Sequence, residues 1–244
     1  MNILLLGDNC IDEYYYGNVN RISPEAPVPV FDFDTKEEKP GMAANVFENF
    51  KALGVNPTFL TSEHSYKTRF IDKKTGQHLL RVDKDVPGQP VQINIDLDSF
   101  DCIVISDYDK GTITYDLIDK ICKKYSGPIF IDTKKKYLDR FTGCIIKINE
   151  LEYNNALALP LHDNIIITLG KQGAMFHNEL FPAPEVDVFD VCGAGDTFLA
   201  ALAYRYLDKD CLKEAIKFAN AASAVTVRHR GVYSPTYTEI LEHL

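Results

Sequence analysis

Residues 190–196, with the sequence DVCGAGD, have the clearest potential for chemistry in this 244-residue chain. A helical pattern over residues 194–207 follows the small residues at once, so the first amide groups of that helix have no partners within it. Such a helix start favours an anion, because free N–H groups and the helix dipole both attract negative charge. From the sequence alone, Asp196 is equally well explained as a helix cap or as a catalytic carboxylate.

A second helix that begins at glycine is predicted over residues 41–54. Apolar residues recur in it every three or four positions, and Gly54 ends the pattern.

Two further motifs admit structural explanations. On spacing alone, Asn149 and Glu152 are better explained as a helix cap and its capping-box partner than as metal ligands. The glycines of residues 168–173 (TLGKQG) fit a tight turn.

The elements that must position these motifs alternate along the chain. Apolar, β-branched runs at residues 101–106, 128–132, 144–148 and 164–169 are separated by helical stretches, which predicts a parallel sheet covered by helices. Residues 66–72 and 77–83 flank a short polar turn and predict a hairpin, and the proline-rich residues 21–34 predict a loop that leads into an edge strand. We expect one domain over residues 1–244, with a three-layer α/β fold and a small β lid near residues 14–35 and 66–83.

Composition excludes several classes of protein. With 26 Lys and Arg against 35 Asp and Glu, the net charge of −9 disfavours nucleic acid and anionic membranes as partners. No run approaches the ~18 apolar residues of a membrane span. The six cysteines include no CxxC pair, so neither a zinc site nor a disulfide framework is expected. The absence of a signal-like N-terminus favours a cytoplasmic location.

Together the motifs resemble the ribokinase-like carbohydrate kinases of the PfkB family. The segments that carry the resemblance are residues 7–12, 40–45, 149–152, 168–173, 190–196 and 218–222. The resemblance implies a ribokinase-like fold, ATP and Mg²⁺ as cofactors, and phosphorylation of a sugar or sugar phosphate. Residues 21–30 (RISPEAPVPV), 79–83 and 106–111 narrow it to the heptose 7-phosphate kinases of the ADP-heptose pathway.

The resemblance also implies roles for individual residues. Asp196 would be the base that takes the proton from the sugar hydroxyl. The amides of Ala194, Gly195 and Asp196 would form the anion hole for the transferring phosphoryl group, with Gly193 as a further catalytic residue of the same motif. The residues expected to bind the sugar or a phosphate it already carries are Asp12, Gly41, Asn45, Lys67, Arg69, Arg81, Asp107 and Lys110. Those expected on the nucleotide side are Lys134, Asn149, Thr168, Gly170, Gly173 and Asn220. Asn149 and Glu152 would organise hydrated Mg²⁺.

The substrate expected from the narrower resemblance is heptose 7-phosphate, phosphorylated at the anomeric hydroxyl. A fructokinase- or ribokinase-like kinase and a catalytically silent sugar- or nucleotide-binding module remain as alternatives. Asp196 in an intact GAGD favours an enzyme, because a silent module need not keep its base.

The chain departs from the family pattern at three places. Met42 replaces a glycine, and Cys192 replaces a threonine. Only residues 62–65 separate the predicted strand that ends at Thr61 from the lid hairpin, so the chain is expected to be a trimmed member. Trimming can expose apolar surface, which leaves a homodimer formed through the lid as a further expectation.

Overall fold

The computed structural model describes residues 1–161 and 164–244. Its strands are β1 (Ile3–Ile22), β2 (Pro29–Met42), β3 (Thr58–Asp72), β4 (His78–Lys84), β5 (Cys102–Asp107), β6 (Ile129–Thr133), β7 (Ile145–Asn149), β8 (Ile165–Thr168), β9 (Ala174–Phe176) and β10 (Glu179–Phe181). Its helices are α1 (Ala43–Ala52), α2 (Tyr115–Lys124), α3 (Glu150–Asn154), α4 (Ala194–Lys209), α5 (Leu212–Thr226) and α6 (Tyr237–Leu241). In the described ranges, no helix is both long and apolar enough to cross a bilayer.

All ten strands belong to one sheet, in the order β10-β9-β8-β7-β6-β5-β1-β3-β4, with β2 paired to β1 off this path. The pairs from β3 through β1 and β5 to β8 are parallel. The pairs of β9, β10, β4 and β2 with their neighbours are antiparallel. The mostly parallel central sheet predicted from the sequence is therefore confirmed.

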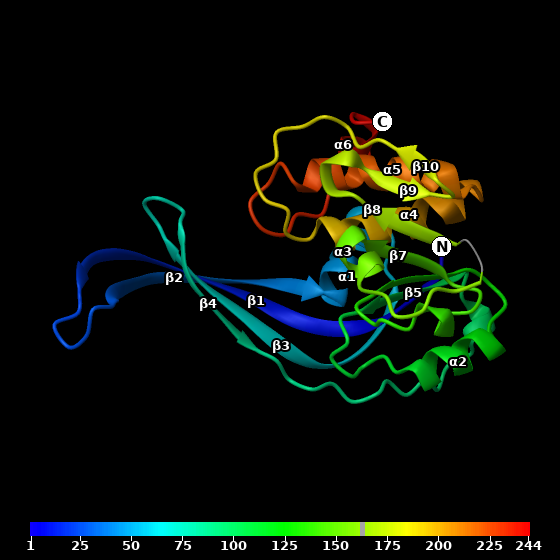
Figure 1. Ribbon diagram of the computed structural model, residues 1–244, viewed down its shortest axis with the longest axis horizontal. Helices are drawn as coiled ribbons and strands as arrows, with labels where there is room; N and C mark the ends of the chain where they lie inside the picture. The colour runs from blue at the N-terminus through cyan, green and yellow to red at the C-terminus, as the bar shows by residue number, and fades with distance from the viewer. Residues whose placement is uncertain (162–163) are drawn as a thin grey trace.

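Helices cover the core of this sheet on both faces, which completes the expected three layers (Figure 1). Successive residues of a strand point to opposite faces. Ile3 and Leu5 accordingly pack with α1, α4 and α5 in one apolar cluster, whereas Leu4 and Leu6 pack with α2 in the other. Strands buried on both faces must be apolar throughout, which explains the continuous runs in the sequence.

The lid is an extension of the same sheet and not a separate sheet. Up to Gly7, β1 pairs with β5, and from Asn9 onward that position beside β1 is taken by β2. Strands β2, β1, β3 and β4 then continue as a long twisted arm beyond the covering helices (Figure 1). The predicted edge strand and hairpin are both present in this arm.

Strand β3 passes from the core into the lid without a break. The sequence predicted two strands here with a link at residues 62–65, and that break is wrong. Gly7 pairs with Thr61 and Asn9 with His64, so β3 carries one extra residue at this point. A β-bulge absorbs an extra residue and lets pairing resume, so the core part of β3 continues directly into its lid part.

Candidate active site

The chain turns sharply at the N-cap of α4, which leaves the first amide N–H groups of the helix open to an anion. Gly193 is the N-cap and has φ 79°, a conformation that favours glycine. A Cβ there would also lie 2.8 Å from Asn45 Nδ2. The preceding loop is fixed by the Asp190 carboxylate, which accepts hydrogen bonds from the Cys192 and Gly231 amides at 3.0 and 2.8 Å. An anion hole at this helix start is therefore sterically feasible.

Asp196 lies in the first turn of α4 and is 5% exposed. The Asn45 amide donates to its Oδ2 at 2.9 Å, and the Tyr108 hydroxyl donates to its Oδ1 at 2.9 Å. Burial raises the pKa of Asp196 to about 6, although the hydrogen bond from Asn45 opposes that rise. A carboxylate with this pKa is ionised at neutral pH and is basic enough to take a proton from a hydroxyl during its attack.

A buried ion pair lies beneath the start of α4, and sequence reasoning missed its lysine. Lys147 of β7 contacts Asp132 of β6 at 2.6 Å, and both residues are buried. The Lys147 ammonium lies 3.0 Å from where a Cβ on Gly195 would be, so the cation is close to the anion hole. The signal was available, because Lys147 is the one charged residue in the apolar run of residues 144–148.

A cavity of about 580 Å³ adjoins the same helix start. Its lining includes Ala194 and Gly195 together with four residues predicted on the nucleotide side, namely Thr168, Gly170, Gly173 and Asn220. Its apolar lining, which the sequence did not indicate, includes Val186, Val188, Phe198, Ala224 and Val227. A cavity with apolar walls and a few polar groups suits a planar base with an attached anionic chain.

Asn220 contributes to this cavity indirectly. Its amide donates to the carbonyl oxygens of Phe181 and Pro182 at 2.8 and 3.4 Å. The side chain therefore holds the segment after β10 against α5. Its placement is compatible with the nucleotide side, while its amide nitrogen already donates within the protein.

The pair predicted to organise Mg²⁺ forms a capping box at the start of α3. Asn149 Oδ1 accepts from the Glu152 amide, and Glu152 Oε2 accepts from the Asn149 amide, both at 2.8 Å. Lys134 contacts the other carboxylate oxygen of Glu152. Among the described residues, no group of three His, Cys, Asp or Glu side chains could hold a metal ion. One carboxylate and one amide suit Mg²⁺ bound mainly by water and phosphate oxygens, so these residues fit that ion in an outer shell.

The residues predicted to bind the sugar include a buried ion pair between strands β1 and β3 of the lid. Arg69 Nη1 contacts Asp12 Oδ1 at 2.5 Å, and both side chains are buried. The guanidinium also lies 5.1 Å from the centre of the Tyr14 ring. A Cβ on Gly41 would collide with the Asp12 carboxylate and lie 2.6 Å from Cys10 Sγ, so this close approach requires glycine. The structure thus brings Asp12, Gly41 and Arg69 together.

The remaining cations predicted to bind a phosphate differ in how they are paired. Arg81 lies opposite Arg69 in the strand register but forms two 2.7 Å hydrogen bonds to Asp83. Lys110 contacts Asp85 at 2.6 Å. Lys67 forms no ion pair with any described residue, and its ammonium lies 5.4 Å from the centre of the Tyr108 ring. Lys67 is therefore a cation beside the tyrosine that contacts Asp196.

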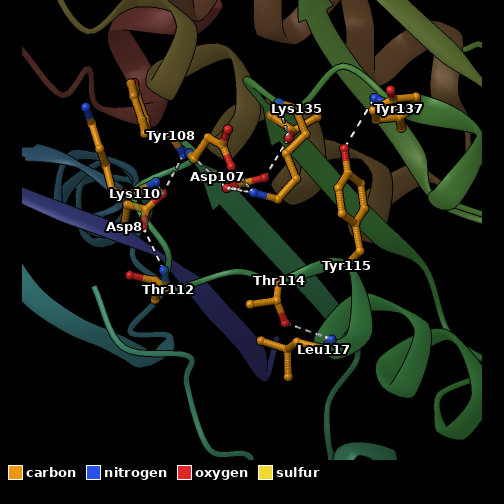
Figure 2. Close-up of polar contacts among 12 residues, drawn as sticks. Asp8, Asp107, Tyr108, Lys110, Thr112, Thr114, Tyr115, Leu117, Lys135 and Tyr137 are labelled. Atoms are coloured by element: carbon orange, nitrogen blue, oxygen red, sulfur yellow. Dashed lines mark hydrogen bonds and ion pairs between the residues drawn. The ribbon is translucent and has the colours of Figure 1, made fainter. Parts of the chain in front are cut away.

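Asp107, predicted on the substrate side, lies in a closed network of its own. Its carboxylate accepts from the Thr133 hydroxyl at 2.6 Å and contacts Lys135 at 3.4 Å (Figure 2). Burial raises the pKa of Asp107 to about 6, and the nearby Lys135 ammonium opposes that rise. The structure does not bring this side chain to Asp12 or Asp196.

Comparison with known proteins finds a matching family and similar folds. The model of the pfkB family of carbohydrate kinases matches residues 146–239. "Bifunctional protein HldE" of Nitratiruptor sp. is 32% identical over 300 aligned residues, which cover 99% of this chain and 64% of that protein. The protein of the same name from Helicobacter pylori (strain J99) is 32% identical over 98% of this chain and 65% of its own length. The chain thus spans slightly less than two thirds of these relatives. The first alignment exceeds the 244 residues present, so that relative carries insertions.

Solved structures share the fold. Ribokinase from Thermotoga maritima superimposes with a TM-score of 0.73 at 18% identity, over 99% of this chain and 98% of that one. Arabidopsis thaliana ribokinase complexed with ribose and ATP gives 0.74 at 16% identity, over 98% and 97%. Phosphofructokinase-2 from Escherichia coli gives 0.73 at 15% identity, over 99% and 97%. The chain has the ribokinase-like fold, and its residues 146–239 match the pfkB family of carbohydrate kinases.

Proposed function

We propose that this protein transfers the γ-phosphoryl group of ATP to a sugar hydroxyl, with Asp196 as the general base. The observation that carries the proposal is the position of buried Asp196 in the first turn of α4, where Ala194 and Gly195 also line the 580 Å³ cavity. A base, an anion-binding helix start and a nucleotide-sized cavity thus share one short segment. A reaction that consumes ATP also suits a cytoplasmic location.

The residues of this chain would divide the work as follows. As the sugar oxygen attacks phosphorus, Asp196 takes its proton, and the bond from phosphorus to the leaving oxygen of ADP breaks. The amides at the start of α4 stabilise charge on the transferring group, and the helix dipole acts in the same direction. Lys147 adds positive potential beneath Gly195. Mg²⁺, when bound, neutralises part of the triphosphate charge, and Asn149 and Glu152 would hold it through water.

For the substrate, we propose heptose 7-phosphate, phosphorylated at the anomeric hydroxyl. One observation supports a sugar that already carries a phosphate: Lys67 has no carboxylate partner among the described residues and lies beside Tyr108. The similarity to the HldE proteins named above, 32% identical along nearly the whole chain, supports a heptose-related substrate.

One observation favours an uncharged sugar, as in a fructokinase- or ribokinase-like kinase. Arg69, Arg81 and Lys110 are each paired with a carboxylate of this chain. A bound phosphate would have to compete with those carboxylates, so Lys67 is the residue on which the sugar-phosphate proposal depends.

We also propose that a second copy of the chain covers the outer face of the lid. Tyr15, Phe31, Phe33 and Phe70 form ring contacts there. Leu80 is paired with Phe70 on the neighbouring strand and is 57% exposed, while Phe33 is 60% exposed. Exposed apolar side chains clustered on a strand face are typical of an interface. Light scattering after gel filtration should give twice the 27.5 kDa chain mass.

The direct test is an ATP-consumption assay over matched free sugars and sugar phosphates. We expect kcat/KM for heptose 7-phosphate to exceed that for the free heptose by about ten- to a hundredfold, the effect of one charge-assisted contact. Equal values for the two would support the uncharged-sugar alternative. If no sugar stimulated ATP turnover, and Asp196→Asn left the rate unchanged, the result would support a catalytically silent binding module.

A further inference from the structure

The loop that follows β5 is anchored by a buried carboxylate at the end of the core part of β1. The backbone amides of Tyr108, Lys110 and Thr112 all donate to Asp8, at 2.7, 3.1 and 3.2 Å (Figure 2). Asp8 is 1% exposed. A carboxylate that accepts three amide hydrogen bonds in a buried position holds the loop in one conformation.

The same loop delivers Tyr108 to the proposed base. Its hydroxyl donates to Asp196 Oδ1 while the Asn45 amide donates to Oδ2, so both carboxylate oxygens are held and the plane of the group is fixed. The Tyr108 ring is contacted by the ammonium groups of Lys67 from the lid and Lys134 from the end of β6, at 5.4 and 5.3 Å from its centre. Tyr108 therefore stands where the lid, the nucleotide side and the base meet.

We propose that Tyr108 is a positioning residue for phosphoryl transfer, which aims the Asp196 carboxylate at the sugar hydroxyl, and that Asp8 anchors the loop that carries it. The inference rests on the proposed function and deepens it. An ionised carboxylate accepts about four hydrogen bonds, so Tyr108 and Asn45 leave room for the sugar hydroxyl. Correct orientation of a catalytic group contributes strongly to rate, and it depends on neighbours that are themselves fixed.

The effect of the tyrosine has a signature that packing alone does not produce. Besides burial, Asn45, Tyr108 and Lys147 lower the pKa of the Asp196 carboxyl, and Asp132 raises it. The Lys134 ammonium and the thiols of Cys10 and Cys192 also interact electrostatically with Asp196. Removing only the Tyr108 hydroxyl takes away a donor to the ionised form. The pKa of Asp196 must then rise, while the ring and its packing remain.

The test compares Tyr108→Phe with Tyr115→Phe, a matched change at a tyrosine whose hydroxyl accepts from the Tyr137 amide at 3.3 Å and not from a residue of the proposed site (Figure 2). The Asp196 carboxyl carbon is followed by NMR in protein labelled with ¹³C at aspartate and is assigned by its loss in Asp196→Asn. We expect Tyr108→Phe to titrate about one pH unit higher than wild type. We also expect its kcat to fall about ten- to a hundredfold, with the KM for ATP unchanged. Tyr115→Phe should match wild type in both measurements.

An unchanged pKa of Asp196 in Tyr108→Phe would overturn the proposal. A rise in kcat would also overturn it, because the Tyr108 hydroxyl would then compete with the sugar hydroxyl for Asp196.

The pKa measured by NMR tests the role of Tyr108 even if the wild-type protein phosphorylates no sugar. That second finding would reject the proposed function alone. Asp8→Asn supplies an independent route, because it loosens the loop without touching Asp196. It should lower kcat in the wild-type background and have no further effect in Tyr108→Phe, whereas additive losses would contradict the proposal.

Discussion

The proposed nucleotide half and the proposed sugar half of the site are built in different ways. The nucleotide half consists of helix-start amides, glycines at Gly170, Gly173 and Gly193 that adopt positive φ, and apolar walls. The sugar half consists of charged side chains from strands of the lid, of which Asp12 and Arg69 already neutralise each other. The first half is set by local sequence and the second by strand register. Asp196 belongs to both, and the experiments below separate their contributions.

Asp196→Asn should have the largest effect and should affect only the chemistry. We expect kcat to fall about 10²- to 10⁴-fold, the usual contribution of a general base, because the amide cannot accept the proton. The backbone at the start of α4 is unchanged, so the Kd for ATP measured by calorimetry should stay within about twofold of wild type. Turnover close to wild type would remove Asp196 from the mechanism.

Lys67→Met tests the sugar half alone. We expect kcat/KM for the sugar phosphate to fall about ten- to a hundredfold, because one charge-assisted contact is lost, while kcat/KM for the free sugar stays unchanged. Arg81→Met is the matched control, since Arg81 is half exposed and already paired with Asp83. Equal losses for both substrates would show that Lys67 does not contact the distal phosphate.

Acid pH should remove activity through the base. Burial raises the folded-state pKa of Asp196 from 3.8 to about 6. Its ionised form is the active one, so kcat/KM should be constant above about pH 7 and fall tenfold per unit well below pH 6. Asp107 also has a pKa of about 6, and it lies in the separate network with Thr133 and Lys135. If the fall in kcat/KM at acid pH disappeared in Asp107→Asn, the titrating group would be Asp107 and not Asp196.

Backbone strain at Met42 gives the smallest effect. Met42 joins β2 to α1 with φ 56° and ψ −133°, a region in which glycine is favoured, and its side chain is buried. Met42→Ala and Met42→Gly both remove the side chain, and only the glycine relieves the strain. Urea unfolding should therefore find Met42→Gly more stable than Met42→Ala by about 1 kcal/mol. At an unstrained position alanine is usually more stabilising than glycine. If Met42→Ala were the more stable variant, the backbone at Met42 would carry no strain.

The sequence predicted those parts of the molecule that depend on neighbours along the chain. The core strands, the helix that begins at Gly193 and the capping box of α3 follow from periodicity and local motifs. The predicted start of the other helix at Gly41 is wrong, because Gly41 lies in β2, where it pairs with Cys10 of β1, and α1 begins at Ala43. The contacts of Asp196 do not follow from local motifs, because Tyr108 and Asn45 are 88 and 151 residues away. Pairing of Arg69 with Asp12 likewise depends on the register of β3 against β1, and the continuous β3 depends on a bulge that no local pattern marks.

The central claim is that this chain transfers phosphate from ATP to the anomeric hydroxyl of a phosphorylated sugar, and ³¹P NMR of the product tests it most directly. Incubation of the wild-type protein with ATP, Mg²⁺ and heptose 7-phosphate should give ADP and a second sugar phosphate signal coupled to the anomeric proton. The same incubation with Asp196→Asn should give neither. Formation of ADP with only inorganic phosphate, or a new phosphate on any other carbon, would contradict the account.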